Sequence, residues 1–124
     1  MKEFIIVGIG SFFGGGLRYA VGRIVGVGTS TAFPISTFVV NIVGCLLIGM
    51  LSTIALRQGW LTPTMRLLLI TGFCGGFTTF STFISENVNL CSSGHQLMSL
   101  AYMSASIIVG IAAFWLGCMI IKIL

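Results

Sequence analysis

The residues best suited to chemistry lie in one stretch, 72–83, which reads GFCGGFTTFSTF. It combines three glycines with four hydroxyl side chains, and these residue types favour a break in a helix over a continuous one. A break frees backbone carbonyls and amides, which a membrane tolerates only where protein, water or an ion satisfies them. Freed carbonyls face cations and half-helix N-termini face anions, so the stretch predicts an ion site. The alternative is a glycine-rich packing helix whose hydroxyls bond to their own backbone.

Other polar side chains fall on shared helical faces around this stretch. Positions four apart lie on one side of a helix, and this spacing pairs Thr37 with Asn41, Thr79 with Phe83, Thr82 with Glu86 and Tyr102 with Ser106. Apart from Glu86, these groups are neutral hydrogen-bond donors or aromatic rings with positive edges. Such a lining suits a small anion better than a cation. Taken singly, each polar residue also fits a simpler role in hydrogen bonding one helix to another.

The first apolar segment carries a small or basic residue at every fourth position. These are Gly10, Gly14, Arg18, Gly22 and Gly26, and a face of this kind lets two membrane helices pack closely. Arg18 is the exception, because an ionisable residue inside a membrane segment is by default a functional candidate. The alternative is that its long side chain reaches the far interface.

The chain offers no catalytic constellation. Its one histidine, His95, lies in a polar loop, and there is no carboxylate pair for acid–base work. Metalloprotease, serine hydrolase and phosphate-loop motifs are missing, and the four cysteines lack metal-ligand spacing. We therefore expect no enzyme.

The composition requires a membrane to position these residues. Of 124 residues, 56% are hydrophobic and 6% are charged, with a mean hydropathy of +1.14, whereas soluble domains carry about 25% charged residues. A spanning helix needs about 20 apolar residues, so we predict an all-α membrane protein. Its single domain, 1–124, holds four spans at approximately 4–26, 35–56, 67–88 and 97–121. Six scattered basic residues form no run, which excludes a nucleic-acid surface.

Four crossings place both termini and the middle loop on one side of the membrane. That side holds Lys2, Arg57, Arg66 and Lys122, against Arg23 and the deeper Arg18 on the other. The positive-inside rule therefore favours cytoplasmic termini. Transport proteins usually carry a broken helix twice, in symmetry-related halves, and this chain carries one. We infer a homodimer that brings two breaks together.

The sequence resembles the Fluc or CrcB family of fluoride channels in several motifs. Stretch 72–83 is similar to the third-span signature of that family along its whole length. Residues 34–41 resemble its P-x-G-T-x-x-x-N pattern, with Ser36 in place of glycine. Residues 10–19 resemble G-G-x-x-G-A-x-x-R-Y, with Ser11 and Gly15 as the departures.

The resemblance implies an antiparallel, dual-topology homodimer in the cell membrane, with two pores for passive export of toxic fluoride. This would overrule the orientation taken from scattered charges. It also implies an anion pore in which Asn41 donates its amide to the ion and Phe80 and Phe83 present ring edges. The polar track would be formed by Ser81, Thr82, Glu86, Tyr102 and Ser106, with Arg18 drawing anions into a vestibule.

The resemblance further implies a structural Na⁺ that is not transported. The backbone carbonyls of Gly75 and Thr78 from both subunits would hold it at the dimer centre. Four oxygens suit a hard cation.

Two other functions stay open on the residues alone. One is a proton-coupled exporter of the small multidrug resistance type, which needs a glutamate embedded in its first span. Glu3 lies only at the edge of that span and Glu86 is the sole other acid, which counts against the exporter. The second is a helical subunit of a larger complex without transport activity of its own.

Overall fold

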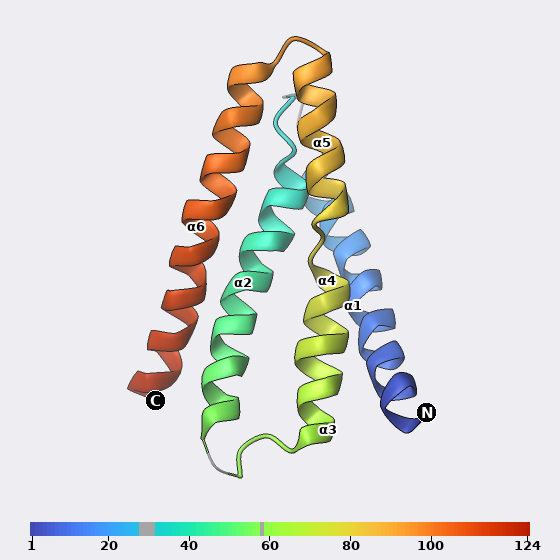
Figure 1. Ribbon diagram of the computed structural model, residues 1–124, viewed down its shortest axis with the longest axis vertical. Coiled ribbons are helices and arrows are strands. Elements are labelled where there is room, and N and C mark those ends of the chain that lie inside the picture. The colour runs from blue at the N-terminus through green and yellow to red at the C-terminus, as the bar shows by residue number, and fades with distance from the viewer. Residues whose placement is uncertain (28–31, 58) are drawn as a thin grey trace.

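The protein is a bundle of four membrane-spanning helices, seen in a computed structural model that describes residues 1–27, 32–57 and 59–124. The elements are α1 (Lys2–Gly26), α2 (Ile35–Leu56), α3 (Pro63–Arg66), η1 (Leu67–Cys74), α4 (Gly75–Phe77), α5 (Ser81–Ser92) and α6 (Gln96–Ile123). Both termini lie at the same end as the α2–α3 connection, and the α5–α6 turn lies at the other end (Figure 1). The four predicted spans are confirmed.

The third span differs from its predicted limits of 67–88, since it runs over Pro63–Ser92. It begins earlier because the Thr62 side chain accepts a hydrogen bond from the Met65 amide at 3.1 Å, and Pro63 stands at the first helical position. The predicted break is confirmed at residues 78–80, which separate α4 from α5 (Figure 1). Thr78 there has an extended backbone, with φ −91° and ψ 162°.

Glycines allow close packing between two pairs of helices. A side chain at Gly10 or Gly14 of α1 would collide with the η1 backbone around Phe73. In the same way, Gly49 of α2 faces the backbone of α6, and Gly117 of α6 faces that of α2. The predicted glycine face of α1 is thus a packing surface, as small residues commonly are between membrane helices.

Much of the apolar surface faces outward. The buried apolar core is small and consists of Val40, Cys74, Phe77, Leu90, Tyr102 and Ile121. Large side chains such as Phe12 and Ile108 are 75% and 67% exposed, which suits a chain surrounded by lipid or by another copy. Phe80, at the break, is 74% exposed.

The packing of α1 against η1 can be tested by substituting alanine for Gly14. The added Cβ meets the Phe73 backbone, so we expect a loss of stability of about 1–3 kcal/mol, the usual cost of overpacking. The measurement is the thermal unfolding midpoint in detergent. Gly8→Ala and Gly16→Ala are matched controls, because no atom lies within 4 Å of a Cβ at either position. Equal midpoints for all three variants would contradict the close approach.

Candidate functional site

Asn41 of α2 holds the break in the third span. Its Nδ2 donates a hydrogen bond to the Thr79 carbonyl at 3.0 Å, and its Oδ1 accepts one from the Thr79 amide at 2.9 Å. One side chain therefore satisfies both backbone groups of a residue that lies outside any helix. An amide nitrogen carries two hydrogens, and among the described residues the second N–H of Asn41 has no acceptor in the bundle.

Hydroxyl groups satisfy further backbone groups at the break. The Thr78 amide and its Oγ1 both donate to the Cys74 carbonyl at 3.0 Å, and the Thr82 amide donates to Thr79 Oγ1 at 3.2 Å. In a continuous helix the amides of Thr79 and Thr82 would bond the carbonyls of residues four positions earlier. Those carbonyls belong to Gly75 and Thr78, and the break diverts both amides away from them.

Arg18 lies beside the break. Its Nε donates to the Gly76 carbonyl at 3.2 Å, which anchors the side chain within the bundle. It also lines a cavity of about 90 Å³ together with Gly22, Ser36, Thr37, Val40, Thr79 and Thr82. The guanidinium therefore faces a small polar space between α1, α2 and the third span.

Glu86 is held by two hydroxyl groups from other helices. Thr37 Oγ1 of α2 donates to its Oε2 at 2.7 Å, and the Tyr102 hydroxyl of α6 donates to its Oε1 at 2.9 Å. Within the described part of the chain, the carboxylate has no ion-pair partner. Helical spacing groups Glu86 with Thr82, but the hydrogen bonds run to Thr37 and Tyr102. Tyr102 is fully buried, so the three residues tie α2, α5 and α6 together.

A largely apolar cavity of about 280 Å³ lies beside the break. Its lining residues are Asn41, Cys45, Ile48, Thr78, Thr79, Phe80, Phe83 and Ser106. The rings of Phe80 and Phe83 have centroids 6.1 Å apart, and Phe83 also meets Tyr102 edge to face at 5.0 Å. The Ser106 Oγ is buried and has no hydrogen-bond partner among the described residues. An unpaired buried hydroxyl is costly, so Ser106 is the one side-chain group in this lining whose cost the described residues leave uncompensated.

The structure therefore brings most of the predicted site residues together at the break. Asn41, Phe80, Phe83 and Ser106 share the apolar cavity, and Arg18 and Thr82 share the small polar one. Ser81 begins α5 and is exposed, outside both linings. Gly75 is the first residue of α4, and Thr78 follows its last residue.

Three more residues stand beside these, and helical spacing already pairs Thr37 with Asn41 and Thr79 with Phe83. Thr37 binds Glu86, Thr79 is the residue that Asn41 holds, and Cys45 lines the apolar cavity. Thr37 and Cys45 are each one helical turn from Asn41. Helical spacing from Asn41 therefore signals both residues, although it does not give their partners.

Comparison with known proteins shows which family shares this arrangement. The model of the family described as CrcB-like protein, Camphor Resistance (CrcB), matches residues 5–118. A protein from Chlorobium phaeobacteroides named fluoride-specific ion channel FluC is 43% identical over 123 residues, covering 99% of this chain and 95% of the relative. A protein of the same name from Flavobacterium psychrophilum is 40% identical over 122 residues, covering 98% of both chains. The same name belongs to a Chlorobaculum tepidum protein that is 43% identical, with 99% of this chain and 97% of the relative covered.

Substituting alanine for Asn41 tests its role at the break. The amide and carbonyl of Thr79 would both lose their partner, and each unpaired buried group costs about 1–3 kcal/mol. We expect a lower thermal midpoint in detergent, and Asn89→Ala, which alters an exposed amide of α5, serves as the control. Equal midpoints would show that the break does not depend on Asn41.

Proposed function

The chain belongs to the CrcB-like family, and we propose that it is a fluoride-selective channel through which fluoride leaves the cell passively. The observation that carries this proposal is the similarity along almost the full chain to proteins named fluoride-specific ion channels. As a member of this family the protein is a channel and not an enzyme, and its four long apolar helices make it a multi-pass protein of the cell membrane.

The chemistry of the apolar cavity supports an anion as the ligand. Fluoride is a small, strongly hydrated anion, so a narrow path must replace its water with aimed hydrogen-bond donors. The free N–H of Asn41 and the unpaired hydroxyl of Ser106 are such donors, and both residues line the cavity. Phe80 and Phe83 add ring edges, which are the positive parts of an aromatic ring. Neutral donors of this kind bind an anion without trapping it, as conduction requires.

The polar residues around the small polar cavity would continue the path. Arg18 would draw anions into the small polar cavity, and Ser81 and Thr82 would line the way past it. Beyond them lies the Glu86 cluster, in which Thr37 and Tyr102 hold both carboxylate oxygens. This directed bonding keeps the negative group fixed at the side of the path.

A second copy of the chain would complete the pore as an antiparallel, dual-topology homodimer. The apolar cavity lies at the surface of one chain, and Phe80 beside it is 74% exposed. A partner packed on this face would enclose the cavity and cover the ring. Two copies related by a two-fold axis would form two such pores.

A structural Na⁺ at the dimer centre fits the residues that the break presents. The amides of Thr79 and Thr82 bond elsewhere, so among the described residues the carbonyls of Gly75 and Thr78 lack their usual helical donors and could act as ligands. Gly75 is exposed, with open space around it, and two copies would supply four oxygens to a hard cation. When bound, Na⁺ would neutralise the carbonyl dipoles and hold the two broken spans together.

Fluoride efflux from liposomes tests the proposed function. We expect the purified protein to release trapped fluoride rapidly, as read with a fluoride electrode, and to release no chloride under the same conditions. No efflux from folded, dimeric protein, or equal release of both halides, would overturn the proposal.

Replacing Phe80 with isoleucine tests the ring edge. Isoleucine keeps much of the apolar volume but lacks the positive edge, so we expect fluoride efflux to fall to the level of empty liposomes while the dimer stays folded. Phe12→Ile is the control, because Phe12 is equally exposed, at 75%, and lies outside the apolar cavity. Normal efflux through the Phe80 variant would refute the role of the ring.

A further inference from the structure

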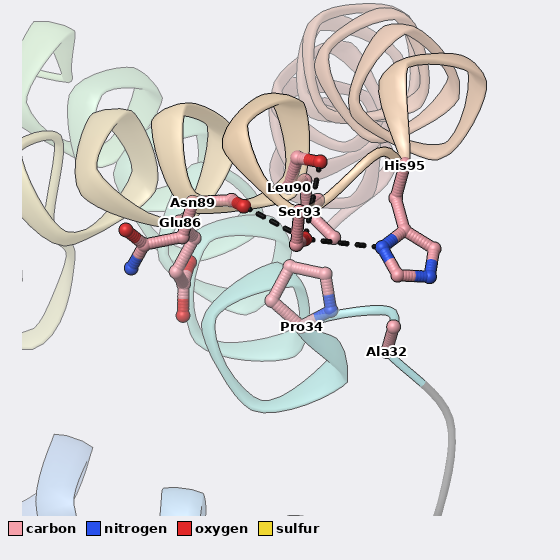
Figure 2. Close-up of a pocket in the computed structure, with 7 residues that line it drawn as sticks. All are labelled: Ala32, Pro34, Glu86, Asn89, Leu90, Ser93 and His95. Carbon is pink, nitrogen blue, oxygen red and sulfur yellow. Dashed lines mark hydrogen bonds between the residues drawn. The ribbon is translucent and has the colours of Figure 1, made fainter.

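A third cavity lies at the end of the bundle that holds the α5–α6 turn. Its volume is about 270 Å³, and it is lined by Ala32, Pro34, Glu86, Asn89, Leu90, Ser93 and His95. Figure 2 shows Glu86 and His95 on opposite sides of this lining, with Pro34 between them. His95 is exposed, whereas Glu86 is half-buried and reaches into the bundle.

This cavity begins where the polar route ends. The carboxylate of Glu86 binds Thr37, and Thr37 lines the small polar cavity beside Arg18. We propose that the third cavity is the aqueous mouth of the anion route and that His95 sets its charge. This inference rests on the proposed function, because it concerns how fluoride enters or leaves the same path.

The balance of charge in the mouth depends on His95. Of the residues that line it, Glu86 and His95 are the titratable ones, and a negative carboxylate alone would repel an arriving anion. Neither α2 nor the neighbouring start of α6 carries a charged residue, and Arg23, in the last turn of α1, is outside the lining. Histidine changes its charge between about pH 5 and pH 8, so protonation would offset the charge of Glu86.

The hydrogen bonds around His95 leave one ring nitrogen free to take up that proton. Ser93 Oγ donates to the carbonyls of Asn89 at 2.9 Å and Leu90 at 3.3 Å. The same Oγ lies 3.1 Å from His95 Nδ1, and which of the two atoms donates depends on the tautomer of the ring. Among the described residues Nε2 has no hydrogen-bond partner, and protonation there breaks no existing bond. Figure 2 shows a dashed line from Ser93 to one ring nitrogen of His95 and none at the other.

Single-channel fluoride currents in planar bilayers test the proposal, with the same pH in both chambers and low ionic strength. We expect the native current to rise about two- to fivefold between about pH 8 and about pH 5.5, the range that one exposed charge produces. His95→Gln should keep a low current at both pH values, and His95→Lys a high current at both. The rise should shrink as inert salt is added, because salt screens exposed charges.

The double variant His95→Gln with Gln96→His is the matched control. It keeps the composition but moves the imidazole to a neighbouring exposed position outside the lining. Because a charge acts over many ångströms at low ionic strength, we expect a rise smaller than the native one. A native current that ignores pH, a rise that persists in His95→Gln, or a rise in the double variant as large as the native one would overturn the role of His95. Absence of fluoride current from the native protein at every pH would instead overturn the proposed function.

Discussion

A backbone polar group inside a membrane needs a partner, and the break between α4 and α5 concentrates this requirement at one place. Asn41 meets it with a pair of hydrogen bonds to Thr79, and Arg18 meets it from the other side at the Gly76 carbonyl. These two residues come from α2 and α1, so the break also fixes how both helices lie against the third span. Groups that the bundle leaves unpaired at this place are then the ones available to an ion.

The same requirement explains the arrangement around Glu86. A carboxylate removed from water is costly unless hydrogen bonds compensate it, and Thr37 and Tyr102 each donate to one of its oxygens. Since the donors come from α2 and α6, the acid links helices that the break alone would not join. The cluster therefore lies between the small polar cavity, which Thr37 lines, and the cavity at the end of the bundle, which Glu86 lines.

The sequence predicted the spans and the break well, because both depend on local composition. Hydropathy located the helices. The glycines and hydroxyl side chains of 72–83 indicated where the third span is interrupted. Partners across helices were harder, since spacing reveals only which residues share one helical face. It grouped Glu86 with Thr82, whereas the hydrogen bonds come from Thr37 and Tyr102. His95 was set aside as a loop residue because nothing in the sequence places it opposite Glu86.

The close glycine contacts join helices that are not consecutive in the chain. α1 packs tightly on η1, and α2 packs tightly on α6. During synthesis, α1 and α2 therefore enter the membrane before their tight partners have been made. The surface of α2 around Gly49 stays open to lipid until α6 leaves the ribosome. This helix has 28 residues and follows all the others. Completion of the bundle is consequently a late event in biogenesis, and a nascent chain that stops short of α6 lacks the packing of its own second helix.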